Sequence, residues 1–329
     1  MSALENVKTY TGKNLETIFF RPMLSGPSAL DLGVRVLYNM PVPTTVQMWE
    51  PRNNVLQKYT TGGWSGGDAA RKLQKTIRLH RVKAELGYSA SDYFSLVYEL
   101  ITNRADVNMD DLSGTELEEA ETALFKRAIA ESIRATMWAG DTAAAGGLDT
   151  FDGFLKTVML YSNANKVYTY NYDTDAMKTP GASVALFDDL WSNADERLKD
   201  LKAEGQLAYF VSSDVHDAYE KHLDGMSADG AYTDYINGRK ELLYHGIPVV
   251  DTRISSYLSA LGASSPVPRS FCMLTDRRNL TLAVNTADFP GNEIRMWYNP
   301  DEMENRQRAV FMAGCDVLDE GLVSFAYRM

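Results

Sequence analysis

The chain has 329 residues, enough for one large domain or for two smaller ones with separate cores. Its formal net charge of −11 argues against a dedicated nucleic-acid binder, because such a protein normally carries a basic surface. Two cysteines exclude a disulfide framework and indicate a reducing compartment. The first residues lack the positive-then-apolar order of a signal peptide, and no run approaches about 18 apolar residues, so we expect no membrane contact and synthesis in a cytoplasm.

The first 86 residues divide into an arm and a predicted hairpin. Residues 1–43 contain several prolines and little periodicity, which predicts an extended N-terminal arm. Residues 44–86 hold two β-rich stretches on either side of TTGGWSGG, and they predict one long β-hairpin with legs of about 50 Å. The apolar residues of the returning leg change phase near residue 80, which predicts a bulge or twist in this strand.

The charge of this hairpin sets it apart from the rest of the chain. It holds eight basic and three acidic side chains, so it carries +5 and the remainder carries −16. A two-stranded ribbon is not stable alone in water, so it needs a surface, and an acidic one fits its charge. Another copy of the chain offers such a surface, although a solvated charged loop is the alternative. The residues expected to contact a neighbouring copy are Trp49, Arg52, Lys58, Trp64, Arg71, Lys72, Lys75 and Arg78.

A long helix is predicted over residues 113–139. Ser113 and Glu116 form a capping box, and Gly140 ends the periodic run. Its length of about 40 Å suits a strut along a flat domain. Acidic residues crowd its first turns, where the helix dipole favours them, and basic residues follow. The acidic residues of these first turns are Glu116, Glu118, Glu119 and Glu121.

The rest of the chain alternates between helical and strand patterns. A second helix is predicted over 187–204, followed by a buried strand and a shorter helix after Ser213. Residues 241–253 predict one strand interrupted at Pro248. Four strand patterns lie between residues 270 and 327. The mixture predicts the α+β class.

One motif invites an enzymatic interpretation. Gly63-Trp-Ser-Gly-Gly67 matches the G-x-S-x-G pattern of serine hydrolases, with Ser65 as nucleophile and Asp214 and His216 as possible partners. The residues before Ser65 are too polar for the buried strand that such a nucleophile requires. We therefore keep the hydrolase only as an alternative and predict no catalytic residue, metal or cofactor. Cys272 and Cys315 lie in apolar strand patterns and are expected to be core residues.

The order of these elements resembles the major capsid protein of tailed bacteriophages, which has the HK97-type fold. Residues 44–86 are similar to its extended E-loop, and residues 113–139 are similar to the spine helix of its peripheral (P) domain. FDGFLKTV, LFDDLWSNADERLKDL and YHGIPVVDTR resemble stretches that follow in that family. The resemblance implies an arm at 1–43, the E-loop at 44–86, a P domain at 87–205, an axial (A) domain at 206–269 and closing strands of both domains at 270–329.

The function implied by this resemblance is structural. Copies would form hexamers and pentamers of an icosahedral shell around double-stranded DNA, which they would contact weakly, and each E-loop would meet the acidic spine face of the next copy. Scaffolding, portal and decoration proteins are the implied partners. The implied location is the virion capsid, assembled in the cytoplasm of a host bacterium. Encapsulin shells, which have the same fold and enclose a cargo enzyme, are the second interpretation.

Overall fold

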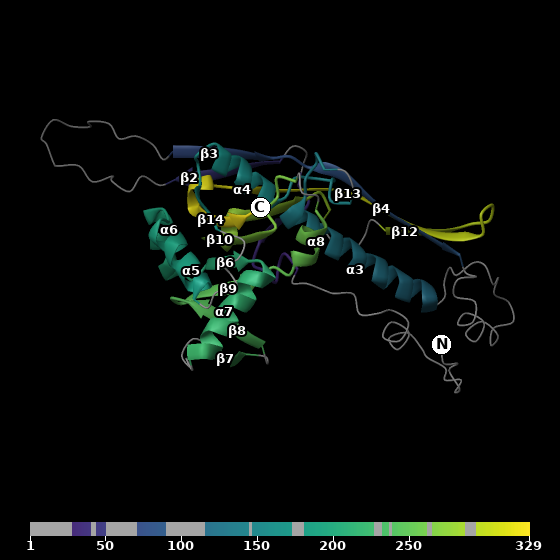
Figure 1. Cartoon of the computed structure of the whole chain (residues 1–329). Helices are drawn as coiled ribbons and strands as arrows, with labels where there is room; N and C mark the ends of the chain where they lie inside the picture. Colours follow the sequence, from purple (N-terminus) through teal and green to yellow (C-terminus); the bar gives the residue numbers. More distant parts are fainter. Residues whose placement is uncertain are drawn as a thin grey trace, which may run out of the picture.

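The structure is a computed structural model, and it contains two sheets, a separate two-stranded ribbon and helices on both sides of the larger sheet (Figure 1). The residues that it describes are 28–40, 44–50, 71–89, 116–144, 147–172, 181–226, 232–236, 239–261, 265–286 and 294–329. No helix in this part of the chain is long and apolar enough to cross a bilayer.

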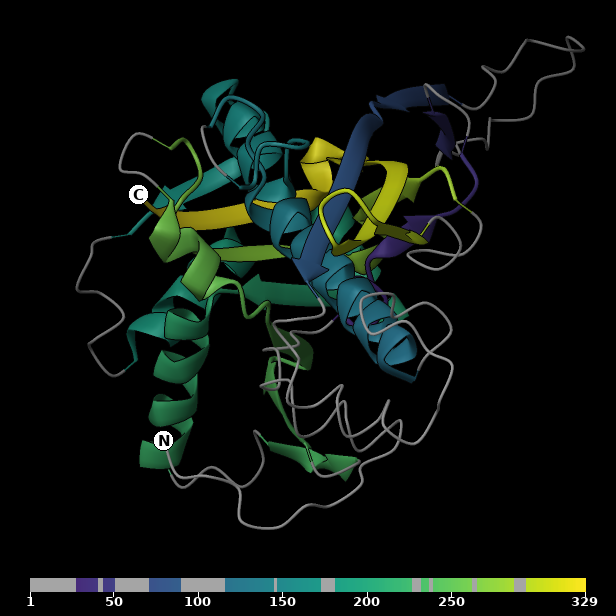
Figure 2. The ribbon, with the colours of Figure 1, turned by 90° about the vertical axis from the view of Figure 1, so that its right-hand side faces the viewer.

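The five-stranded sheet is organised around β13 (Glu304–Val317). Along one edge, β13 pairs with β11 (Leu280–Val284) and with β12 (Ile294–Asn299), and β1 (Arg35–Leu37) continues the sheet beyond β11. Along its other edge, β13 pairs with β4 (His80–Ser89) in an antiparallel register that joins Phe311 to Val82. In Figure 2, the long helix α3 (Glu116–Ala139) crosses in front of this sheet.

The seven-stranded sheet separates two hydrophobic cores. Its order is β5 (Tyr168–Asn171), β14 (Val323–Arg328), β10 (Ser270–Asp276), β6 (Leu207–Val211), β9 (Ile247–Asp251), β8 (Arg239–Tyr244) and β7 (Tyr232–Ile236). Successive side chains of a strand point to opposite faces. Phe210 and Phe271 therefore join the core of α3, α4 (Phe154–Asn163) and the five-stranded sheet, whereas Tyr209 and Cys272 join the second core.

The second core lies under α5 (Ala182–Ser192) and α7 (Ser213–Met226). The helix predicted over 187–204 is instead three pieces: α5, α6 (Glu196–Asp200) and a 3₁₀ turn over Leu201–Glu204. The interruption arises because Asp195 acts as a helix N-cap and accepts a hydrogen bond from the backbone of Arg197. The remaining elements are α8 (Ser255–Ala260) and 3₁₀ turns over Arg277–Asn279 and Glu320–Leu322.

The predicted hairpin is shorter than 44–86. Only β2 (Thr44–Glu50) and β3 (Arg71–Ile77) pair as a two-stranded ribbon, whereas β4 belongs to the five-stranded sheet. The change of phase near residue 80 therefore marks the end of one strand and the start of another, not a bulge. We call β2 and β3 the basic ribbon; the predicted tip, residues 51–70, lies outside the described residues.

The long helix follows the prediction at its C-terminal end. It ends at Ala139, and Gly140 and Gly153 then bring two backbone segments together, with the N–H of Gly153 donating to the carbonyl of Gly140 at 2.8 Å. Ser113, the predicted cap, lies outside the described residues. Residues 241–253 form two strands, β8 and β9, because His245 and Gly246 both adopt positive φ angles (51° and 79°) and turn the chain back.

Replacing Gly153 by alanine is expected to destabilise the protein by about 1–3 kcal/mol. Its φ of −84° is ordinary, but an added Cβ would lie 2.6 Å from the carbonyl oxygen of Trp138 and 2.7 Å from the nitrogen of Gly140. The matched control is Gly225→Ala in α7, where the new Cβ meets nothing within 4 Å. Urea unfolding should show equal or greater stability for this control, and equal losses at both positions would contradict the steric explanation.

Candidate assembly site at the base of the ribbon

The base of the basic ribbon is fixed to the body of its own chain. Ile77 is fully buried, and Leu79 is nearly so, in a small apolar cluster with Ala283 and Leu318. Nearer the tip, β2 and β3 pair only with each other among the described residues. The ribbon is therefore anchored at its root, and β2 and β3 lie at the upper left of the molecule in Figure 1.

Lys75 adds a polar anchor to this root. Its ammonium donates a hydrogen bond to the hydroxyl of Tyr161 on α4 and lies 3.5 Å from Oδ1 of Asp316 on β13. The same nitrogen lies 4.8 Å from the centre of the Tyr161 ring, within the range of a cation–π interaction. The ammonium thus contacts a helix and a strand of its own chain, and a contact with a neighbouring copy stays a prediction for this residue.

The ionisation of the Lys75–Asp316 pair is set by its partial burial. Burial raises the pKa of the Asp316 carboxyl, and the positive charge of Lys75 offsets this only in part. Burial alone would lower the pKa of Lys75, but the hydrogen bond to Tyr161 and the charge of Asp316 raise it. Because the carboxyl has a higher pKa in the folded protein, its contribution to stability falls as pH rises from its ordinary pKa through the raised one.

Lys75→Met is expected to lower the unfolding free energy by about 1–3 kcal/mol at neutral pH, because Asp316 is left partly buried without a cation. The loss of Lys75 raises the pKa of Asp316 further, so the deficit should shrink as pH falls toward about 4 and the carboxyl becomes protonated. Denaturant unfolding at several pH values measures both effects.

The control for this prediction is Lys83→Met. Lys83 donates to Glu85 at 2.8 Å, but both side chains are exposed, so the loss of stability should be much smaller than for Lys75→Met. If Lys75→Met were no more costly than Lys83→Met, or if its deficit did not depend on pH, the proposed anchor would be wrong.

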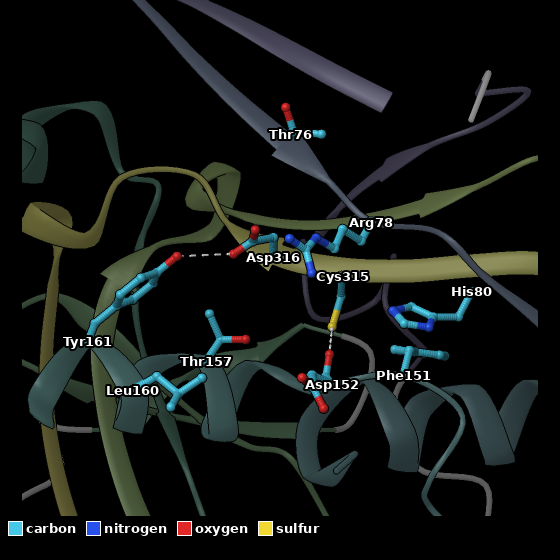
Figure 3. A pocket seen from close by; sticks show the side chains of 10 residues that line it. All are labelled: Thr76, Arg78, His80, Phe151, Asp152, Thr157, Leu160, Tyr161, Cys315 and Asp316. Carbon is cyan, nitrogen blue, oxygen red and sulfur yellow. Dashed lines mark hydrogen bonds between the residues drawn. The ribbon is translucent and has the colours of Figure 1, made fainter. Parts of the chain in front are cut away.

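A pocket of about 190 Å³ opens beside this anchor (Figure 3). Its walls come from the β3–β4 junction, from α4 with the residues before it, and from β13. The lining residues are Thr76, Arg78, His80, Phe151, Asp152, Thr157, Leu160, Tyr161, Cys315 and Asp316. The pocket therefore lies where the ribbon root, a helix of the first core and the central strand of the five-stranded sheet meet.

The acidic and thiol groups of the pocket are already engaged. Asp152 accepts hydrogen bonds from Nζ of Lys156 at 2.6 Å and from the backbone of Thr142 at 2.9 Å. Burial would raise the pKa of Asp152, but these hydrogen bonds lower it. The Cys315 thiol donates to the carbonyl of Asp152 at 3.2 Å, and burial raises its pKa well above the ordinary value. Cys315 is thus a weak nucleophile held in a structural contact.

The predicted contact residues fall into three groups. Lys75 and Arg78 lie at the ribbon root, and Arg78 is exposed and lines the pocket. Trp49, Arg71 and Lys72 lie in β2 and β3, where Trp49 is opposite Lys72. Arg52, Lys58 and Trp64 lie outside the described residues. The four acidic residues of the long helix, Glu116, Glu118, Glu119 and Glu121, occupy the first turns of α3.

Sequence reasoning missed the two partners of Lys75. Tyr161 and Asp316 lie 155 positions apart in the chain, and neither has a local pattern that marks it as a contact. The alternation of β13 indicates a strand but not which polar residue in it faces the ribbon. Only the packing of α4 against β13 brings the two side chains together.

The described residues do not assemble the catalytic site that the serine-hydrolase alternative requires. Ser65 lies outside them. Asp214 accepts hydrogen bonds from the hydroxyls of Ser212 and Ser270, each at 2.5 Å, which makes it part of a local structural network. His216 lies 3.9 Å from Asp217 on α7 instead.

Solved structures show which fold this arrangement represents. The chain is similar to the capsid of the native GTA particle, with a TM-score of 0.56, 16% identity and coverage of 98% of this chain and 95% of that one. It is similar to the mature capsid of bacteriophage PhiM1, with a TM-score of 0.51, 11% identity and coverage of 98% and 92%. The SrpI encapsulin of Synechococcus elongatus matches with a TM-score of 0.52, 8% identity and coverage of 98% and 92%.

The fold is therefore that of phage capsid proteins, the HK97-type α+β fold expected from the sequence. The similarity extends over almost the entire chain, so it covers the ribbon, the long helix and both sheets together. No protein-family model matches the sequence, and no curated protein matches it. At these identities the likeness defines the fold, and the function has to be argued from the chain's own surfaces.

Proposed function

We propose that this chain is the major capsid protein of a tailed bacteriophage and assembles through hexamers and pentamers into an icosahedral shell around double-stranded DNA. The observation that carries the proposal is the match to capsid structures over 98% of the chain, combined with a basic ribbon whose outer part pairs only with itself in the described residues. A ribbon of this kind gains stability by lying on another molecule. The shell, and not catalysis, is then the function of the fold.

The contact between copies follows from charge. Arg71 and Lys72 begin β3, at the end of the ribbon that is farther from its root, while the start of α3 carries clustered glutamates. Individual exposed ion pairs contribute only about 0–1 kcal/mol, so each contact is weak enough to dissociate when misplaced. Repetition around a closed shell makes the finished lattice stable. The acidic balance of the chain also disfavours tight binding of packaged DNA.

The proposal extends to partners and location. Scaffolding, portal and decoration proteins would act with this chain, and assembly would take place in the cytoplasm of the host bacterium. Electron microscopy of the purified protein tests the shell directly, because closed particles are expected and a population of monomers alone would contradict it. Terminase and portal genes beside this gene would support a phage, whereas an adjacent enzyme with a cargo peptide would support an encapsulin-like compartment.

Charge reversal at Arg71 and Lys72 is expected to slow assembly strongly while leaving the subunit folded. Lys75 is left unchanged in this test because its ammonium is bound within its own chain. The control carries the same charge change at Arg35→Glu and Lys221→Glu, two exposed sites outside the ribbon. Light scattering follows particle formation, and rising salt should slow the unmodified protein as well. Equal assembly of both variants would refute the electrostatic contact.

A further inference from the structure

The pocket at the ribbon root is open to solvent on one side, where an apolar group could enter. Leu160 contributes to the wall on this side, and 55% of its side chain is exposed although it is a large apolar residue. Tyr161 supplies aromatic surface beside it (Figure 3). Arg78 and His80 also line the pocket, and the side chain of neither forms a hydrogen bond or ion pair with any described residue. The open side thus offers apolar surface and two polar groups without partners in the described chain.

The size and chemistry of the pocket fit one aromatic side chain. An engineered apolar cavity of about 150 Å³ binds benzene, and this pocket measures about 190 Å³. The carboxylates of Asp152 and Asp316 already have cationic partners in Lys156 and Lys75, so the pocket does not demand a charged ligand. The guanidinium of Arg78, which has no partner in the described part of the chain, favours the face of an aromatic ring.

The sequence supplies such a group at the far end of the ribbon. Residues 59–67, YTTGGWSGG, contain no charged side chain, and Trp64 lies between two pairs of glycines. Glycines permit close backbone approach, and a tryptophan buries a large area when it enters a pocket. Trp64 is therefore the aromatic residue of the chain best suited to be presented on a short neutral loop.

Chain geometry favours a pocket on a different copy. Arg71 follows Trp64 by seven positions, which allows a reach of at most about 25 Å. The strand β3 is extended over about 23 Å and runs from Arg71 towards the pocket, so Arg71 lies at its far end. Trp64 could reach the pocket of its own chain only if the chain doubled back at full extension along β3. The distance along the chain does not restrict the entry of Trp64 into the pocket of a neighbouring copy.

We propose that the pocket between Arg78, Leu160 and Cys315 receives Trp64 from the ribbon tip of a second copy. This inference rests on the proposed shell function, since it names the receiving site of the contact between copies. The tip of the ribbon of one copy then binds at the ribbon root of the next copy. Aromatic burial supplies the specific, apolar part of the contact, while the basic residues supply its long-range attraction.

Thiol labelling at Leu160→Cys tests the pocket in the full chain. The introduced thiol should react rapidly with a maleimide in free subunits and about tenfold or more slowly in assembled particles. The two native thiols provide a low background, because burial raises the pKa of both Cys272 and Cys315. Adding Trp64→Gly should restore rapid labelling in particles. A synthetic YTTGGWSGG peptide should protect the thiol in free subunits, whereas YTTGGGSGG should not.

A second labelling site provides the control for specificity. Tyr170→Cys lies on β5, away from the pocket, and Tyr170 is 43% exposed, so the peptide should not change its rate of labelling. Particles in which the thiol introduced by Leu160→Cys labels as fast as in free subunits would overturn the pocket inference but leave the shell intact. Failure to form particles would instead count against the proposed function, and the peptide experiment would still decide the pocket: no protection by YTTGGWSGG overturns it.

Discussion

Trp138→Ala is expected to lower the unfolding free energy of the subunit by about 3–5 kcal/mol, the usual cost of removing a large buried aromatic side chain. Trp138 lies in the last turn of α3 and is fully buried. Its ring centre lies 5.4 Å from that of Phe154, 5.3 Å from that of Phe210 and 5.9 Å from that of Phe271. These neighbours come from α4 and from two strands of the seven-stranded sheet, so the indole joins α3 to both α4 and this sheet.

The control for this substitution is Trp191→Ala. Trp191 is only partly buried on α5, where the ammonium of Lys202 lies 5.1 Å from its ring centre. Urea unfolding of unassembled subunits should show a clearly smaller loss for this variant. Comparable losses at the two tryptophans would mean that Trp138 is not the centre of the first core.

Removing the side chain of Arg134 is expected to be equally damaging, at about 3–5 kcal/mol for Arg134→Met. Only 4% of this side chain is exposed, and Nη1 donates to the carbonyl of Thr252 at 2.6 Å. Its other nitrogens bind the carboxylate of Glu131, which also accepts a hydrogen bond from Tyr257 at 2.9 Å. The guanidinium therefore ties α3 to the segment that joins β9 to α8.

The double variant Glu131→Gln and Arg134→Met separates the two contributions to this loss. If the cost comes mainly from stranding the charge of Glu131, neutralising that carboxylate should recover part of the stability. Thermal unfolding of both variants measures the difference. A single variant as stable as the unmodified protein would contradict the proposed role of Arg134 as a tie between the two parts of the fold.

Sequence patterns that extend over many consecutive residues predicted much of the architecture. The run from Glu116 to Gly140 has a strong helical period and a clear C-terminal stop, and α3 ends where the pattern indicates. The order of arm, ribbon, long helix and closing strands led to a fold that the solved capsid structures share. Cys272 was expected in the core and is fully buried there.

Other features depend on tertiary contacts that leave no local pattern. The burial of Arg134 is one example: its position late in the helix gives no sign of it, and the backbone carbonyls of Thr252 and Arg253 accept its hydrogen bonds. The hairpin was predicted to continue to residue 86 because β3 and β4 are both strands. Strand partners are chosen by packing, and β4 pairs with β13 more than 200 positions later. The contacts of Lys75 with Tyr161 and Asp316 could not be predicted for the same reason.

Density for the ribbon in a cryo-EM reconstruction of purified particles provides the most direct test. Each β2–β3 strand pair, once past its root, should run over the body of an adjoining subunit, with the indole of Trp64 inserted beside Leu160. A solitary folded subunit whose positively charged strands rest along their full length on its own surface would leave the shell proposal without its physical basis.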